Sequence, residues 1–201
     1  MIHRSGYGFA IMILLFLPLV FSSCQSKDEL MALSKCEFRV KDVGEVTLGG
    51  VPIDGVEEVN DLTNEELGVL LLGILTENLP LALTINVEVR NPNEDVAALD
   101  KAEWILYVDN KMITEGLYDE RIEIPPHNGI SLMRVPVTAN IAEIMAGESN
   151  EALLNLALNL ANAGSQPSLI TLKAKPYIRV RNRLIPYPGF FDIKTEFTSG
   201  E

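Results

Sequence analysis

The strictest constraint on the fold of this chain is a run of alternating apolar and polar residues before Asn91. The apolar positions share one parity: Leu81, Leu83, Ile85, Val87 and Val89. A period of two places successive side chains on opposite faces of a β-strand, so one face should be buried in the core and the other exposed to solvent. The segment Asn91-Pro92-Asn93 should end the strand, because proline fixes φ and Asn93 tolerates a turn.

Several shorter segments show the same strand chemistry with turn residues between them. The first runs from Phe38 to Val56 and is broken by Gly44 and the Gly49-Gly50 pair. The others are residues 104–108, 112–118, 121–124, 130–138, 169–180 and 190–197. Pro176 interrupts the segment 169–180 and suits an edge strand or a bulge. Short strands with regular turns predict a mainly β chain with an antiparallel sheet.

A helix is expected to begin at Thr63, because Thr63 and Glu66 have the spacing of a capping box and Leu62 and Leu67 that of a hydrophobic staple. The apolar residues that follow surround almost the whole helix: Leu67, Val69, Leu70, Leu71, Leu72, Ile74 and Leu75. Such a helix must be buried or must dock on something. It is interpreted as a plug across one end of a sandwich; the alternative is an exposed docking or membrane-contacting element.

A second helix is expected between Ser149 as cap and Gly164 as stop, with leucines between them. Its polar side chains share one stripe: Glu151, Asn155, Asn159 and Asn162. This helix should therefore lie on the surface. The chain is expected to fold with two accessory helices.

The first residues read as an export segment. Residues 9–20 are apolar except for Pro18, and as a helix they would span only about 18 Å, which is short of the roughly 30 Å hydrocarbon core. A transmembrane anchor is the alternative. The end of the segment, Ser22-Ser23-Cys24, resembles the lipobox of bacterial lipoproteins. The resemblance implies that Cys24 is lipidated, with palmitate-like acyl chains, after cleavage; otherwise the signal peptide is cut near Ser23 and Cys24 is a free thiol.

The expected organisation is a signal peptide at 1–23, a lipidated tether at 24–35 and a single domain at 36–201. Gln25 after the cysteine, in similar Gram-negative lipoproteins, goes with the outer membrane. Lys27-Asp28-Glu29 looks like a cell-surface signal, or is a solvated tether. If Cys24 is lipidated, Cys36 is the one remaining cysteine. It can then form no internal disulfide and should be buried near Phe38.

The formal net charge of −12 makes nucleic acid an unsuitable partner, and removal of the leader takes away Arg4 and no acid. One feature opposes this charge. Five basic residues share odd numbering near the C-terminus and would project from one face of a regular strand: Lys173, Lys175, Arg179, Arg181 and Arg183. They are a candidate anion site for lipid head groups or acidic glycans. The alternative is pairing with acids of a neighbouring strand, such as Glu115, Glu120 or Glu123.

No catalytic residue, cofactor or metal site is predicted. His127 is the single histidine after the leader and lies in an expected turn, and no zinc motif or phosphate-binding loop is present. An acidic run could supply oxygen ligands for calcium: Asp54, Glu57, Glu58, Asp61, Glu65 and Glu66. It lacks the order of a preformed calcium loop and is interpreted as a solvated surface.

The strand and turn segments together resemble a known family. The matching pieces are Leu83 to Asn93, Trp104 to Lys111, Glu115-Gly116, Ile124-Pro125-Pro126 and Val135-Pro136-Val137. They resemble the late embryogenesis abundant (LEA) group-2 domain, also called the water stress and hypersensitive response (WHy) domain, over about residues 37 to 145. The resemblance implies a β-sandwich of fibronectin or immunoglobulin type, linked to stress response and to protein or membrane binding, without catalytic residues.

These observations predict a lipid-anchored, non-enzymatic outer-membrane protein, on the periplasmic side or the cell surface, that acts as a binding or stress-protective module. It should be monomeric and should meet the membrane through its lipid, with envelope proteins or anionic glycans and lipids as further partners. An accessory subunit of an envelope complex is the first alternative, and an exposed apolar patch would be its sign. A hydrolase that uses two carboxylates in a cleft is the second.

Overall fold

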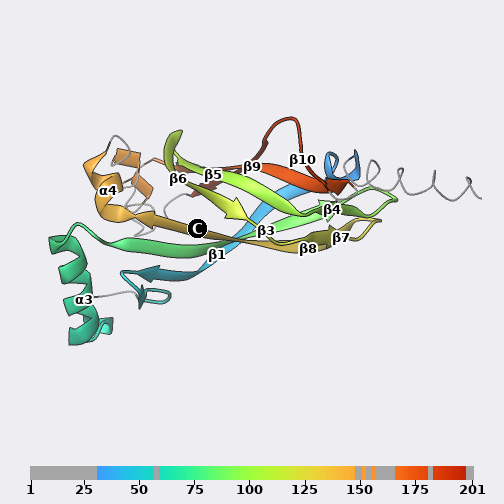
Figure 1. Cartoon of the computed structure of the whole chain (residues 1–201). Coiled ribbons are helices and arrows are strands. Elements are labelled where there is room, and N and C mark those ends of the chain that lie inside the picture. The colour runs from blue at the N-terminus through green and yellow to red at the C-terminus, as the bar shows by residue number, and fades with distance from the viewer. Residues whose placement is uncertain are drawn as a thin grey trace, which may run out of the picture.

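A computed structural model of the chain describes residues 31–56, 59–147, 151–152, 155–156, 166–180 and 183–197. Antiparallel strands form two packed layers, and the helices Asn64–Leu75 and Ile141–Ala146 lie at one end (Figure 1). The predicted fold class, mainly β with antiparallel sheets in a sandwich and accessory helices, is confirmed.

The first sheet has four strands in the order β2-β1-β3-β8. The second has the order β10-β9-β5-β6, with β11 also paired to β9, and a separate ribbon joins β4 to β7. In chain order the elements are β1 (Glu37–Leu48), β2 (Val51–Pro52), a 3-10 helix (Val59–Asp61), α3 (Asn64–Leu75), β3 (Pro80–Asn91), β4 (Ala97–Leu99), β5 (Lys101–Val108), β6 (Lys111–Tyr118), β7 (Ile122–Ile124), β8 (Gly129–Asn140), α4 (Ile141–Ala146), β9 (Ser168–Val180), β10 (Arg183–Pro186) and β11 (Phe191–Phe197).

Strand β3 shows the predicted alternation. Its core face is buried, whereas Glu88 and Arg90 point outward and pair with β1, Glu88 with Arg39 and Arg90 with Glu37. The core between the sheets is built from such inward positions of both layers: Ile85, Val87, Val89, Trp104, Leu106, Met133, Val135, Val137, Leu172, Ile178 and Ile193. Burial of these side chains, at roughly 25 cal/mol per Å², is the main stabilising term of the sandwich.

The turn after β3 is held by a fully buried asparagine side chain. Asn91 Nδ2 donates to the carbonyls of Asp95 (2.8 Å) and Ile124 (3.0 Å), while its Oδ1 accepts from the backbone and side-chain amides of Asn93. Asn93 Nδ2 also donates to the Ala32 carbonyl at 2.9 Å. All hydrogen-bonding capacity of Asn91 is thus used, which a buried amide requires. The turn ties β3 to β7 and to the first described residues.

Pro176 does not lie on an edge strand, contrary to expectation. It pairs with Ala102 of β5 inside β9, and the register continues unbroken on both sides. Its carbonyl accepts from Tyr187 N, so its nitrogen also faces the side occupied by β10 and β11. β11 pairs with β9 up to Ala174 and β10 from Tyr177, so Pro176 lies in the gap between them and its missing N–H costs no ladder bond.

The helical regions differ from expectation in one place. α4 follows β8 directly and was not predicted; Asn140 caps it by accepting from Ala142 N at 3.2 Å. In the second predicted helix, residues 151–152 and 155–156 are helical, whereas Ser149 and Gly164 lie outside the described residues. So do the leader and Cys24. None of the described helices is long and apolar enough to cross a membrane.

Candidate functional site

α3 begins as the sequence predicts. Thr63 Oγ1 accepts from Glu66 N at 3.2 Å, and Glu66 Oε2 accepts from Thr63 N at 2.8 Å, which completes the capping box. The hydrogen bonds from the backbone and the hydroxyl of Thr63 lower the pKa of the Glu66 carboxyl. The first turn of the helix therefore has its own polar partners and needs no contact with the sandwich to form.

The other end of α3 is closed equally well. Glu77 adopts a left-handed backbone with φ of 55°, a conformation that favours glycine. Asn78 N donates to the Gly73 carbonyl at 2.9 Å and Glu77 N to the Ile74 carbonyl at 3.2 Å, the two bonds of a Schellman motif. The Thr76 hydroxyl donates to the Leu72 carbonyl at 2.8 Å. Both ends of the helix are thus capped locally.

α3 meets the sandwich along one narrow line. Gly73 is buried, and a Cβ atom placed on it would lie 2.7 Å from Leu79 Cδ1. A Cβ atom on Gly49, in the turn between β1 and β2, would lie 3.3 Å from the same Leu79 atom and 3.7 Å from Leu70 Cδ2. Two glycines thus let the helix approach the end of the first sheet closely, and only this side of the helix is covered.

The rest of α3 is exposed, so its interpretation as a plug is wrong. Four large apolar side chains are more than half exposed and are called the α3 apolar surface below: Leu71 (59% exposed), Leu72 (61%), Ile74 (59%) and Leu75 (81%). Val69 is 45% exposed. In Figure 1 the helix stands away from both layers. The caps define where the helix begins and ends, but an apolar pattern on all sides cannot show which side is covered. The structure favours the alternative, an exposed docking or contacting element.

The basic residues of β9 have partners on their own sheet. Lys173, Lys175 and Arg179 alternate with buried residues, as predicted. The Lys173 ammonium lies 5.4 Å from the centroid of the Tyr107 ring, and that of Lys175 lies 5.9 Å from the Phe190 ring. Arg183 is exposed on β10, and Arg181 lies outside the described residues. The anion site stays a prediction.

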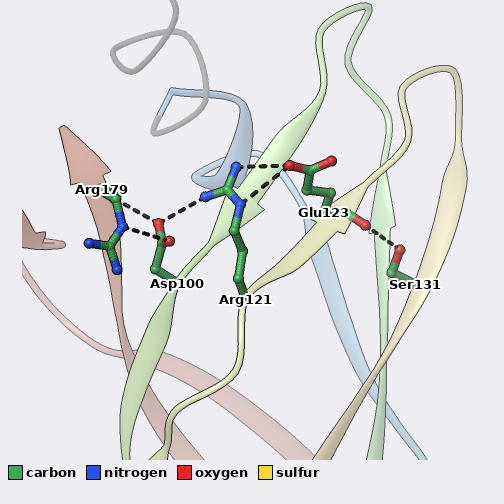
Figure 2. A network of polar contacts seen from close by, with 5 residues as sticks. All are labelled: Asp100, Arg121, Glu123, Ser131 and Arg179. Atoms are coloured by element: carbon green, nitrogen blue, oxygen red, sulfur yellow. Dashed lines mark hydrogen bonds and ion pairs between the residues drawn. The ribbon is translucent and has the colours of Figure 1, made fainter. Parts of the chain in front are cut away.

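Arg179 belongs to a polar cluster with Asp100, Arg121 and Glu123 (Figure 2). The side chain of Asp100 is 4% exposed and accepts from Arg179 N (2.8 Å), Arg179 Nε (3.3 Å) and Arg121 Nη1 (2.9 Å). Arg121 also pairs with Glu123 at 3.0 Å. Asp100 was not predicted as a buried residue, although an acid that follows three apolar residues at 97–99 is a signal for a buried carboxylate that needs a partner. The cluster is structural, since its charges satisfy one another.

Two acids do share a groove on the outer face of the second sheet. A groove of about 430 Å³ is lined by Glu103, Trp104, Ile105, Glu115, Gly116 and Phe190. Both Glu103 and Glu115 are exposed, and Glu103 accepts from the Tyr177 hydroxyl, which raises the pKa of Tyr177. A carboxylate pair needs unequal environments to divide acid and base roles, and two exposed groups lack them. This groove offers little to a hydrolase.

The remaining candidates have simple structural surroundings. His127 is exposed in the 126–129 turn, where His127 and Asn128 both have positive φ. Cys36 is buried, and burial raises the pKa of its thiol to about 11, which confirms the expected burial. Asp54 accepts from Val46 N at 2.8 Å, and Glu57 and Glu58 lie outside the described residues. Nowhere in the described ranges do three His, Cys, Asp or Glu side chains gather as metal ligands.

Comparisons with known proteins give only distant structural likenesses. No family model matches the chain, and no curated protein matches it. A protein from Archaeoglobus fulgidus of known structure is similar with a TM-score of 0.38 at 12% identity, over 81% of this chain and 98% of that one. A solution structure named as a proposed late embryogenesis abundant protein has a TM-score of 0.36 at 12% identity, over 98% and 91% of the two chains. An Arabidopsis thaliana protein has 0.33 at 14% identity, over 59% and 70%. At these TM-scores none of the three supports an argument about function.

Proposed function

We propose that the protein is a lipid-anchored, non-enzymatic accessory subunit of an envelope complex, with α3 as its docking element. The observation that carries the proposal is a helix capped at both ends on which four large apolar side chains are more than half exposed. Soluble proteins rarely leave such residues together in water without a partner surface. The anchor is inferred from the leader and Cys24, which would hold the domain at the outer membrane.

Anchoring and docking can be tested separately in the full-length protein. Cys24→Ala should abolish labelling by a fatty-acid probe and leave unprocessed precursor; unchanged labelling would contradict the anchor. The double variant Leu72→Ser, Leu75→Ser should keep the label but lose docking. In a sucrose gradient of gently solubilised envelopes, the wild-type protein should sediment with a larger particle and the double variant as a monomer. Equal sedimentation of both would contradict the docking role.

A second candidate is a stress-protective module, favoured by the Asn91-Pro92-Asn93 turn that resembles the LEA group-2 domain. Such a role predicts that the protein preserves the activity of a test enzyme through drying. The double variant on α3 separates the two candidates, because protection by the sandwich should not depend on Leu72 and Leu75. Protection lost with these leucines would instead attribute it to α3.

A further inference from the structure

We propose that the α3 apolar surface occupies an apolar groove of a partner protein, and that lysine and arginine side chains flank this groove. The inference rests on the proposed function and names the chemistry of the partner for the same surface. It follows from the shape of the exposed surface and from the charge around it.

The exposed arc of α3 requires an enclosing partner. At 100° per residue, Leu71 and Leu75 point away from the buried Gly73, and Leu72 and Ile74 lie to its two sides. The four positions of the α3 apolar surface therefore cover an arc of about 160°, wider than the stripe of about 100° by which a helix usually packs. A single flat contact would leave part of the arc in water. A groove into which the helix sinks covers all four side chains.

The charged side chains in the stretch of chain that contains α3 have one sign. From position 42 to position 89 the chain contains no Lys, Arg or His. It contains ten acids, of which Asp42, Glu45 and Glu88 pair with Lys41, Arg134 and Arg39 outside this stretch. The other seven lie between positions 54 and 77: Asp54, Glu57, Glu58, Asp61, Glu65, Glu66 and Glu77. Glu65 in the first turn of α3 and Glu77 just after its end are both exposed. An apolar surface with acids at both ends is complementary to an apolar groove with bases at both ends.

The same charges argue against two other occupants of this surface, a lipid membrane and a second copy of the chain. Helices that lie in a membrane interface carry Lys and Arg on their polar face, and anionic lipid repels acids. In a pair of copies, antiparallel helices would bring Glu65 of one copy near Glu77 of the other, and parallel helices would bring equivalent acids together. Neither a lipid surface nor the α3 helix of a second copy offers the positive charge that the stretch from position 42 to position 89 lacks.

The place of α3 in the fold also suits a protein partner away from the lipid. The first described residues contact Asn93 at the far end of β3, and α3 lies at the opposite end (Figure 1). The twelve residues of β3 span about 40 Å, and the seven steps from Cys24 to Met31 add at most about 25 Å. The tethered domain can therefore present α3 well clear of the lipid head groups.

The test is site-specific photo-crosslinking from position 72 of the lipidated full-length chain in its host cells. Leu72 is 61% exposed, so a photo-reactive amino acid there should leave the fold intact. We expect one protein adduct, and mass spectrometry should locate it in an apolar segment with Lys or Arg nearby. Reversal of charge by Glu65→Lys with Glu77→Lys should lower the adduct yield about tenfold, because rim charges govern the association rate.

The matched control is Glu94→Lys with Glu196→Lys, which changes the net charge equally at exposed positions away from α3. It should leave the adduct yield unchanged. Replacement of the identified partner lysine or arginine by glutamate should restore crosslinking to the Glu65→Lys, Glu77→Lys variant. An adduct with phospholipid or with a second copy, no adduct, or equal loss in the control would overturn the inference. In any of these outcomes, the sedimentation test remains separate. If the wild-type protein sediments with a larger particle and the Leu72→Ser, Leu75→Ser variant as a monomer, the docking role is supported and only the proposed chemistry of the partner is contradicted.

Discussion

Gly73 of α3 packs directly against Leu79, and a Cβ atom at Gly73 would lie 2.7 Å from Leu79 Cδ1 and 3.1 Å from the Asn78 carbonyl oxygen. This contact fixes one side of the helix on the sandwich. The opposite side, centred on Leu71 and Leu75, remains in solvent. The exposed helix is thus held by a contact that depends on the absence of a side chain.

The two glycines of α3 provide a matched pair of substitutions. Gly68→Ala should stabilise the helix by about 0.5–1 kcal/mol, because nothing lies within 4 Å of the new methyl group and alanine is the better helix former. Gly73→Ala should fail to stabilise it, since Leu79 must move to admit the methyl group. Hydrogen exchange of the α3 amides measures both. Equal gains in protection would contradict the close contact.

The capping box can be tested in the same way. Thr63→Ala should lower the stability of α3 by about 1 kcal/mol, because Glu66 N loses its acceptor. The hydrogen exchange of the α3 amides should accelerate, while that of the core strands stays unchanged. Asn64→Ala, at the neighbouring exposed position, is the control and should have little effect.

Substitutions on the α3 apolar surface should change the stability of the protein little, whereas substitutions in the core should lower it. Leu72→Ala should change the free energy of unfolding by less than about 0.5 kcal/mol. Leu99→Ala, which empties a site that is 1% exposed, should cost about 2–5 kcal/mol. Urea denaturation of both variants checks this. A large loss for Leu72→Ala would mean that the helix is packed after all.

The asparagine turn should be costly to change. Asn91→Asp keeps the shape and the acceptor oxygens but removes both donors, so the Asp95 and Ile124 carbonyls lose their partners and a charge is buried. The expected loss is about 2–4 kcal/mol, measured by urea denaturation. Asn128→Asp, on an exposed turn residue whose side chain is in solvent, should change the free energy of unfolding little.

Burial of Cys36 makes stability fall at high pH. A thiol whose pKa is raised on folding, from 9.0 to about 11, favours the folded state below pH 9, and this contribution is lost as the pH rises towards 11. The tyrosines whose pKa values are raised act in the same direction. The decrease in unfolding free energy between pH 9 and 11 should therefore be smaller in Cys36→Val than in the wild type. An identical decrease would contradict burial of the thiol.

The sequence predicted the parts of the fold that local chemistry decides. Alternation along β3, the capping box of Thr63 and Glu66 and the burial of Cys36 depend on neighbours in the sequence. The covered side of α3 depends on Leu79 and Gly49, which the helix meets only in the folded chain. The same is true of Asp100, whose partners Arg121 and Arg179 are distant in the sequence and meet it only in the folded chain.

The central claim is that α3 is open in the isolated protein and covered in the envelope. Its most direct test is the reaction of a membrane-impermeant maleimide with Leu72→Cys, in purified protein and in broken envelopes. Buried Cys36 provides an unreactive background, and a thiol in place of the exposed Glu94 provides the control. We predict fast labelling at position 72 in purified protein and strong protection in envelopes, with position 94 labelled equally in both. Equal labelling of position 72 in both preparations would contradict the claim.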